Sequence, residues 1–416
     1  MTHSDPTPAM HRLPRPALSR RRLLAAGALL PAARLSWGAT PAAGDARFVL
    51  VILRGGMDGL GAVPAIGDPA FAAARGPLAA FAEAALPLAG AGSDNFFALH
   101  PALAQMHAMH GRGEMSVLHA VGLPYKERSH FEAQQLLESG GQRPHEITTG
   151  WLGRALAATQ SRGIALQPAV PLVLRGSAAI DTWAPSALPD PAPDLLARLM
   201  QMYAADAQLG PALSRAQSLR ADGMPMTMAT MGSPTLAAAA RPGPGPAVAL
   251  ARQAAEFLGK PGGAQVAVLE IGGWDTHANQ AAPQGALAYN LRQLDTAMAT
   301  LRDGLVANGR WPHTAVLVCT EFGRQVEVNG TQGTDHGSGG AAFVLGGAVA
   351  GGRVLADWPG LAAKDRFEGR DLRITTDLRA VFRGLLADHL RVARAVVDRD
   401  ALPGTASLPV LPLLRA

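Results

Sequence analysis

The sequence predicts an α/β protein, a three-layer α/β/α sandwich around a mainly parallel central sheet. Short runs rich in Val, Leu and Ile recur along the chain and are continuous rather than alternating, which is typical of strands covered on both faces. Between these runs lie segments whose apolar residues recur at helical spacings of three and four. Strands that alternate with helices in this way favour a parallel sheet with helices on both sides.

Six apolar runs are predicted to be strands, and they cover residues 47–53, 115–121, 169–174, 265–271, 314–319 and 341–347. Residues 286–309 are predicted to form a helix, because leucines and one methionine make a single apolar stripe from Leu287 to Leu305 and Gly309 is a typical C-terminal stop. Residues 375–390 show the same periodicity and are predicted to be helical as well.

The first 44 residues resemble a twin-arginine export signal. Consecutive arginines (Arg20, Arg21 and Arg22) precede a short apolar stretch that Arg34 interrupts, and small residues near 39–44 suit cleavage. That stretch is too short to span a bilayer as a mature helix. A basic disordered tail is the alternative interpretation. We expect a protein that the twin-arginine translocase exports already folded, to the periplasm or outside the cell.

The charge distribution argues against nucleic acid as a partner. The formal net charge is +5, but six of the 37 basic residues and one of the 32 acidic residues lie in the first 44 positions. The remainder therefore carries 31 residues of each sign and is neutral. Nucleic-acid binding usually needs a basic surface on the folded domain, so we expect none here.

Residues 45–416 are expected to form a single domain that carries an insertion around residues 205–247. The insertion is rich in Gly, Pro, Ala and Met, which favours a flexible flap or packing surface over a soft-metal site. Its methionines are Met224, Met226, Met228 and Met231. The only cysteine, Cys319, lies in an apolar run and is predicted to be a buried thiol.

Candidate functional residues follow the predicted strands, where ligands gather in open α/β sheets. Four glycine-bordered segments carry acids or histidines, and these residues are Asp58; Asp275 and His277; Glu321; and Asp335 and His336. Carboxylate and imidazole are ligands for divalent cations such as zinc, manganese, magnesium or calcium. Asp275 and His277 lie two positions apart, so in an extended segment they can share an ion. His336 completes a set of two histidines and one carboxylate, and Asp335 is either a further ligand or the carboxylate that orients a neighbouring imidazole.

Ser129 begins another predicted helix and has two interpretations. Ser129 and Glu132 fit a capping box, in which the hydroxyl accepts a backbone hydrogen bond. The start of a helix also favours anions and can position a nucleophilic hydroxyl. Arg128 and His130 beside it suit an anionic ester, and Arg128 or Arg324 is predicted to clamp such an anion.

Seven motifs together resemble a bacterial exported family known as the domain of unknown function number fifteen hundred and one, and they are LRGGMDGL, RSHFEAQ, GWLGR, GGWDTH, TEFGR, GTDHGSGGAAFVLGG and GRDLRITTDLRAV. They occur in order between residues 45 and 395. That family is remotely similar to the alkaline phosphatase and sulfatase superfamily, which implies an alkaline-phosphatase-like fold and one or two metal ions.

The remote resemblance assigns roles by position. Asp58 corresponds to the first metal-binding aspartate, Ser129 to the nucleophile, Asp275 and His277 to a metal pair, and His336 to a late histidine. Phe322 follows Glu321 where many members of the superfamily carry an Asp-His pair, so one ligand of a second metal is missing.

The sequence predicts an exported metal-dependent hydrolase of phosphate or sulfate esters, with an anionic small molecule as substrate. The alternative is a non-catalytic exported protein of the same fold, with a structural or degenerate metal site, which acts in envelope or surface assembly with a co-exported partner. Retained ligand types favour the enzyme, whereas Phe322 and the insertion favour the alternative.

Overall fold

The structure is a computed structural model that describes residues 1, 45–90, 94–185, 191–222, 245–280 and 285–415. The predicted leader (1–44) and the centre of the predicted insertion, with its four methionines, lie outside the described residues. The predictions made for those segments therefore stay predictions. The domain organisation expected for residues 45–416 also stays a prediction.

A nine-stranded sheet forms the centre of the described part of the chain, in the order β10-β4-β9-β8-β1-β7-β5-β6, with β11 paired to β4. The strands are β1 (Arg47–Leu53), β4 (Met115–Gly122), β5 (Gly163–Ala165), β6 (Ile180–Thr182), β7 (Val266–Ile271), β8 (Thr314–Thr320), β9 (Gly340–Leu345), β10 (Arg353–Leu355) and β11 (Thr376–Asp377). All pairings are parallel except those of β9, which runs antiparallel to β4 and β8. The prediction of a mainly parallel sheet is confirmed.

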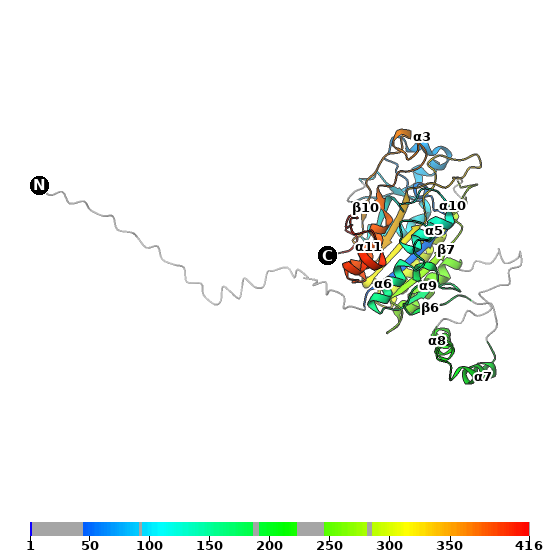
Figure 1. Cartoon of the computed structure of the whole chain (residues 1–416). Coiled ribbons are helices and arrows are strands. Elements are labelled where there is room, and N and C mark those ends of the chain that lie inside the picture. Colours follow the sequence, from blue (N-terminus) through cyan, green and yellow to red (C-terminus); the bar gives the residue numbers. More distant parts are fainter. Residues whose placement is uncertain (2–44, 91–93, 186–190, 223–244, 281–284, 416) are drawn as a thin grey trace, which may run out of the picture. The chain divides into compact units, whose positions relative to one another are not determined.

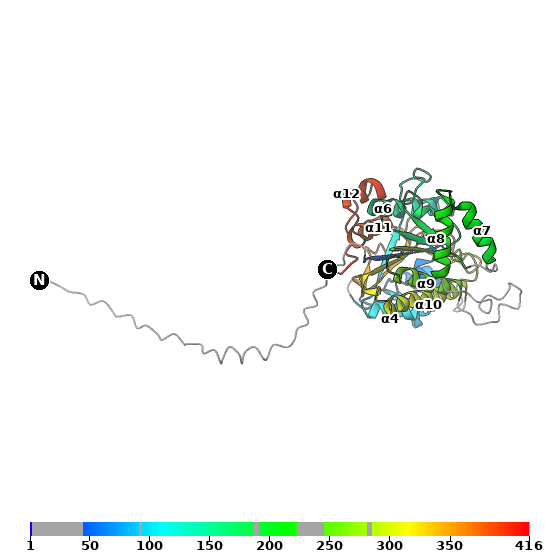
Figure 2. The same cartoon turned by 90° about the horizontal axis from the view of Figure 1, so that it is seen from below.

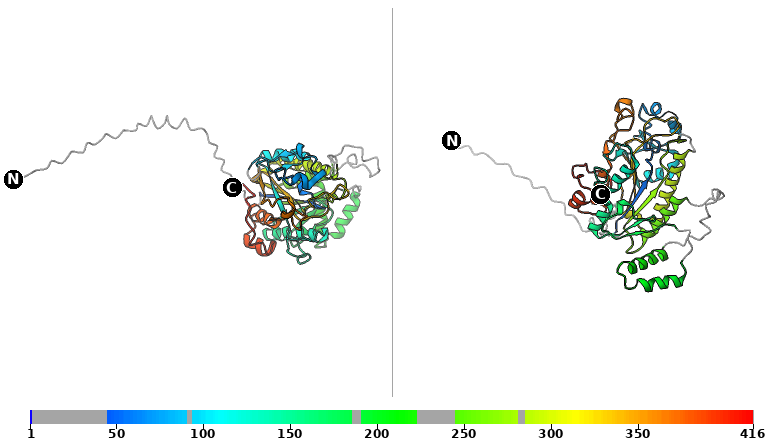
Figure 3. Two further views of the ribbon diagram at one scale, coloured as in Figure 1. Left: turned by 90° about the horizontal axis from the view of Figure 1, so that it is seen from above. Right: turned by 45° about the vertical axis from the view of Figure 1, so that its right-hand side comes forward.

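Helices cover both faces of the sheet (Figures 1 and 2). On one face α4 (Ala104–Gly111), α9 (Pro246–Gly259) and α10 (Ala286–Ala307) share a buried apolar cluster with alternate residues of β1, such as Val49 and Val51. On the other face α5 (His130–Ser139), α6 (Trp151–Thr159) and α11 (Leu378–Gly384) share a second cluster with Phe48 and Leu50. Figure 3 shows the same layers from above. This confirms the predicted three-layer sandwich.

The remaining elements are short or lie on the outside. They are α2 (Gly59–Ala62), α3 (Phe71–Arg75), α7 (Pro193–Tyr203), α8 (Leu209–Asp222), α12 (Arg394–Val396) and the small hairpin of β2 (Leu86–Pro87) and β3 (Ala98–Leu99). None of the described helices is both long and apolar enough to cross a bilayer. Cys319 is buried in β8, as predicted, and burial raises the pKa of its thiol.

One predicted strand is wrong. Residues 169–174 form no strand, and a short 3-10 helix occupies Leu172–Leu174 instead. Pro168 and Pro171 interrupt this apolar run, and proline cannot donate to a strand ladder. The predicted helices at 286–309 and 375–390 do form, as α10 and as α11 with the π-helical turn Leu385–His389 that continues it.

The topology gathers one set of loops at a single edge of the sheet. The parallel strands β1, β7, β8 and β4 all end there, and the antiparallel strand β9 begins there. The loops after β1, β7 and β8, the loop before β9 and the start of α5 therefore meet, although together they span more than 250 residues of sequence.

Candidate metal centre

Four side chains from three of these segments converge on one point. Nε2 of His336 lies 3.0 Å from Nε2 of His130 and 3.0 Å from Nε2 of His277. Oδ1 of Asp275 lies 3.0 Å from Nε2 of His277, 3.2 Å from that of His336 and 3.5 Å from that of His130. Ligand atoms of His130, Asp275 and His336 all lie within 4.8 Å of one another, and His277 adds a further nitrogen beside them.

Each of the three imidazoles is held by an oxygen that accepts a hydrogen bond from its Nδ1. The acceptors are the Glu321 carboxylate for His130 at 2.8 Å, the Asp335 carboxylate for His277 at 3.1 Å and the main-chain carbonyl of Arg128 for His336 at 2.9 Å. Because a carbonyl or carboxylate oxygen can only accept, each ring carries a proton on Nδ1. The Nε2 atoms face one another and Asp275 Oδ1, and in the neutral ring each has a lone pair that can bind a cation.

This arrangement fits a divalent cation. Neutral imidazoles in these tautomers place no hydrogen between nitrogens only 3.0 Å apart, so their lone pairs repel unless a cation lies between them. Metal-ligating histidines usually donate their other ring N–H to a carboxylate or carbonyl in this way. Three imidazole nitrogens and one carboxylate oxygen form a donor set of the kind that zinc prefers.

The electrostatic surroundings keep the acids of the centre ionised. Burial alone would raise the pKa of Glu321, but hydrogen bonds from His130, Gln134 and the Gly55 N–H outweigh it and lower the pKa to about 2. The hydrogen bond to Glu321 in turn raises the pKa of His130, against the effect of burial. Burial would also raise the pKa of Asp275, yet Arg324 and His277 lower it.

The centre has a buried base and a face open to solvent. The side chains of Glu321 and Arg324 are 0% exposed, whereas those of Asp275 and His277 are 46% and 44% exposed. A small molecule can therefore approach the converging ligand atoms from the side of Asp275 and His277.

His130 is the residue whose role the sequence missed, because it was associated with an anionic ester rather than with the metal. It lies one residue after the N-cap of α5, in the connection that follows β4. Extending the search for acids and histidines to the loop after the run 115–121 would have found it. The seven residues between β4 and His130 hid that connection.

Glu321 was predicted to be a ligand, and Asp335 to be either a ligand or the carboxylate that orients a neighbouring imidazole. Glu321 lies beneath the centre and accepts hydrogen bonds from His130, from Gln134 at 3.1 Å and from the Gly55 N–H at 2.8 Å. Asp335 accepts from His277 and from Asn329 at 3.0 Å. Each carboxylate orients one histidine. For Asp335 this is more than the charge of a turn, and for Glu321 it differs from the predicted role as a ligand.

Asp58 is not part of the converging group, and the prediction that it binds the metal is corrected. It caps α2 by accepting a hydrogen bond from the Gly61 N–H at 3.1 Å, and its other oxygen accepts from Arg75 and Gln280. Both Asp58 and Arg75 are buried. The carboxylate is already neutralised by a guanidinium, because a buried acid without a metal needs a cationic partner.

Arg324 and Arg128 were predicted to bind an anion, but both guanidinium groups bond acceptors within the protein. Arg324 donates to the carbonyls of Gly56 at 2.7 Å, Trp274 at 3.1 Å and Thr334 at 3.2 Å, and to Asp275 Oδ1 at 2.7 Å. It therefore ties together the loops after β1, β7 and β8 and the loop before β9. Arg128 donates to two carboxylates outside the centre, those of Asp371 at 2.9 Å and Glu368 at 2.6 Å.

Ser129 is the N-cap residue of α5, but its side chain makes no capping hydrogen bond. The expected capping box does not form, because Glu132 accepts a hydrogen bond from the Tyr125 hydroxyl instead. Burial and this bond raise the pKa of Tyr125 to about 12. The hydroxyl of Ser129 is thus not used for capping, and its role as a nucleophile stays a prediction.

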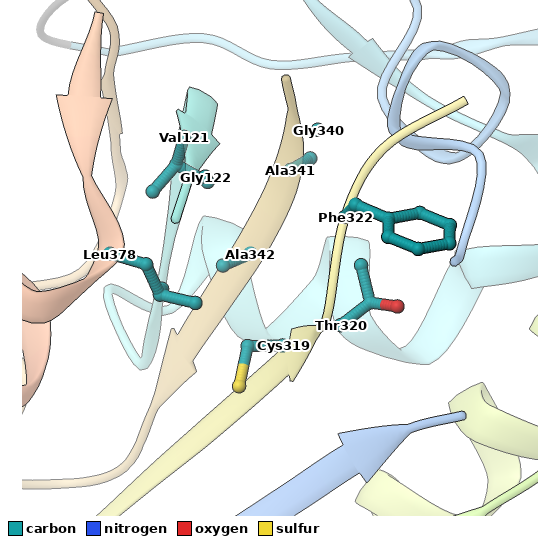
Figure 4. A pocket seen from close by; sticks show the side chains of 9 residues that line it. All are labelled: Val121, Gly122, Cys319, Thr320, Phe322, Gly340, Ala341, Ala342 and Leu378. Atoms are coloured by element: carbon teal, nitrogen blue, oxygen red, sulfur yellow. The ribbon is translucent and has the colours of Figure 1, made fainter. Parts of the chain in front are cut away.

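Phe322 packs against the centre from the side of β8. Its ring centroid lies 4.7 Å from that of His130 and 5.0 Å from that of His336. Figure 4 shows it beside a small, largely apolar pocket between the ends of β4, β9 and β8, which Cys319 and Leu378 also line. An aromatic ring with no ligand atom therefore covers this side of the two histidines.

Several solved structures resemble the chain at low identity. The phosphonate monoester hydrolase of Agrobacterium radiobacter is 11% identical with a TM-score of 0.40, over 84% of this chain and 74% of that chain. The C-terminal periplasmic domain of EcEptC from Escherichia coli, in complex with Zn, is 10% identical with a TM-score of 0.34, over 72% of each chain. Similarity at this level says nothing about activity.

A search of curated proteins finds no match to the sequence. A family model, in contrast, matches residues 45–400, which is most of the chain and nearly the same region as the motifs quoted above. The protein therefore belongs to the family described as "Protein of unknown function (DUF1501)".

Proposed function

We propose that the protein is an exported metal-dependent hydrolase of phosphate or sulfate esters. The observation that carries the proposal is the convergence of three imidazole Nε2 atoms and Asp275 Oδ1, each imidazole held by an oxygen at Nδ1. The open face of the centre supports a catalytic use, because a purely structural ion is usually closed off by its ligands.

The chain's own residues have defined tasks in this proposal. His130, His277, His336 and Asp275 hold the ion, for which zinc suits the nitrogen-rich donor set better than magnesium or calcium. When bound, such an ion supplies Lewis-acid polarisation of an ester oxygen. Glu321 fixes the orientation of His130 from below.

Ser129 is the candidate nucleophile. It stands at the start of α5, directly before the ligand His130, and the positive end of a helix favours an anion there. The hydroxyl makes no capping bond but interacts with Tyr125, and in this proposal it attacks the phosphorus or sulfur atom while its proton leaves with the alcohol. The ester bond to the alcohol breaks as the bond to Ser129 Oγ forms, and water releases the acid afterwards.

A second candidate function is favoured by one specific observation. Arg128 and Arg324 both spend their guanidinium groups on protein acceptors, so neither is free to bind an anionic substrate. A non-catalytic exported protein that keeps the centre as a scaffold, and acts in envelope or surface assembly with a co-exported partner, accounts for this.

Export itself is part of the proposal. Its support is the arginine-rich leader, which lies outside the described residues. The neutral remainder of the chain is consistent with an anionic small molecule rather than a nucleic acid as ligand. Replacing Arg20, Arg21 and Arg22 by lysine should prevent recovery of the protein from the periplasm or the medium, as measured by fractionation.

One experiment separates the two candidate functions. The full-length chain is expressed with its leader, recovered after export, assayed for bound metals by mass spectrometry and screened against aryl phosphates and aryl sulfates. We expect bound zinc and turnover that Asp275→Ala and Ser129→Ala abolish, while Arg143→Ala, an exposed control, retains it. Bound metal without turnover across the screen would favour the scaffold, and absence of metal would exclude the centre.

A further inference from the structure

The number of metal ions that the centre can hold follows from how its carboxylates are used. A second ion needs donors that the first does not occupy. Within the residues that the structure describes, His130, Asp275 and His336 are the one set of three His, Cys, Asp or Glu side chains whose ligand atoms lie within 4.8 Å of one another. Three more carboxylates lie at this edge of the sheet, those of Asp58, Glu321 and Asp335.

Asp58 has no free oxygen to offer. One oxygen accepts from the Gly61 N–H, and the other accepts from both Arg75 and Gln280. Because the side chains of Asp58 and Arg75 are 0% and 1% exposed, an ion could bind Asp58 only by leaving a buried guanidinium unpaired, which is strongly unfavourable.

Arg324 supplies a fixed positive charge against the ligand Asp275. Its Nη2 lies 2.7 Å from Asp275 Oδ1, the same oxygen that faces the three imidazoles. The guanidinium cannot swing away to substrate, because its side chain is 0% exposed and its other N–H groups bond three main-chain carbonyls. With one ion bound at this oxygen, a second ion at Asp275 would meet both that ion and the guanidinium charge.

Phe322 covers the side of the metal centre formed by His130 and His336. Its ring packs on His130 and His336 and offers no ligand atom. The Cβ of any residue placed at Gly56 would lie 2.6 Å from this ring, so the loop after β1 is also closely packed here. This side of the two histidines therefore offers an aromatic ring in place of a ligand atom.

We propose that the centre binds a single divalent ion and that Arg324, with Arg75 on Asp58, takes the electrostatic place of a second one. This inference rests on the metal centre of the proposed function. The ion pairs agree with it: Arg324 bonds Asp275 and Arg75 bonds Asp58, so both aspartates already have a guanidinium beside them.

The test counts metal ions rather than turnover. The exported full-length protein is stripped with a chelator and titrated with Mn²⁺, with the stoichiometry read by native mass spectrometry and the coupling by electron paramagnetic resonance. We expect one ion per chain and the spectrum of an isolated ion. Two ions per chain, or the spectrum of an exchange-coupled pair, would overturn the inference even if ester hydrolysis is confirmed.

A pair of variants tests the role assigned to Arg324. Arg324→Met removes the charge and its hydrogen bond to Asp275, and the variant should take up a second Mn²⁺ at concentrations where the wild type holds one. Arg143→Met, whose arginine is exposed and remote from the centre, should still hold one. A folded Arg324→Met protein, checked by circular dichroism, that holds only one ion contradicts the role of the charge. If the variant does not fold, the wild-type count decides.

Should the wild type bind no Mn²⁺ and no Zn²⁺, both this inference and the proposed centre fail. One ion per chain without turnover on any ester supports the single-ion centre and excludes only the hydrolase.

Discussion

Two polar regions at the same edge of the sheet began from the same sequence signal, an aspartate shortly after a buried strand. Around Asp275 the neighbours are imidazoles and the side chain is 46% exposed. Around Asp58 the neighbours are Arg75 and Gln280 and the side chain is 0% exposed. Asp275 accepts a hydrogen bond from Arg324 but also faces three imidazoles and solvent, whereas Asp58 accepts only from N–H donors within the protein among the described residues. An acid at a strand end is therefore a candidate ligand where groups that donate electron pairs also surround it.

The largest expected effect comes from breaking the buried ion pair between Asp58 and Arg75. Arg75→Met leaves the Asp58 carboxylate without its cation, and breaking a buried ion pair in this way costs about 3–5 kcal/mol of unfolding free energy. Urea unfolding of the metal-free protein measures it. The exposed pair Arg143–Glu146 is the control, because Arg143→Met should cost less than about 1 kcal/mol. Equal losses in the two variants would show that Asp58 is not dependent on Arg75.

The next effect concerns the stability of the protein at low pH and the buried carboxylate of Glu321 beneath the metal centre. The pKa of Glu321 falls from 4.5 to about 2 on folding, because hydrogen bonds from His130 and others outweigh burial. Because the pKa of Glu321 is lower in the folded than in the unfolded protein, the ionised carboxylate stabilises the folded state above pH 4.5. This contribution to the unfolding free energy, about 3 kcal/mol, is lost as the pH falls toward 2. Urea unfolding of the metal-free protein at pH 5 and pH 3 should show this loss. Glu321→Gln should flatten the pH dependence, and an unchanged slope would contradict the assignment.

A comparison within the metal centre gives a somewhat smaller effect. Glu321 and Asp335 each orient one histidine, but the Glu321 side chain is 0% exposed and that of Asp335 is 48% exposed. We expect Glu321→Gln to weaken metal affinity by about 100-fold and Asp335→Asn by about 10-fold, the range usual for partners of ligating histidines. Competition titration with a chromophoric chelator measures both. The reverse order would mean that burial does not set the strength of this support.

The smallest expected effect is at Ser129. A serine that caps a helix contributes about 1 kcal/mol, but the hydroxyl of Ser129 makes no such bond. Ser129→Ala should therefore change the unfolding free energy by less than about 0.5 kcal/mol while it abolishes any turnover. Asp377 caps α11 by accepting from the Arg379 N–H, so Asp377→Ala should cost about 1 kcal/mol or more. A large loss at Ser129 would restore the capping interpretation.

The sequence predicted the core of the fold well, because the central strands are marked locally. The apolar runs at 47–53, 265–271, 314–319 and 341–347 all lie in strands buried along most of their length. It failed at 169–174, where prolines override the apolar pattern. The short strands β5 and β6 at one end of the sheet have three residues each, too few to show a periodicity.

The sequence also supplied most members of the centre but not their roles. Asp275, His277 and His336 were chosen because acids and histidines on glycine-bordered loops favour metal binding, and the structure brings these three together. His130 was missed as a ligand. Glu321 and Asp335 were chosen correctly as members of the site but act on histidines rather than on the ion.

The sequence by itself determined the layered α/β architecture, the family and the edge of the sheet where the chemistry gathers, because strand patterning and motif order are local properties. Only the tertiary structure decided which groups meet. Whether a carboxylate faces an arginine, an imidazole Nδ1 or open space depends on contacts across 17 residues for Asp58 and Arg75 and 191 residues for His130 and Glu321. Those separations leave no periodicity in the chain, and the geometry of hydrogen bonds at about 3 Å selects the partners.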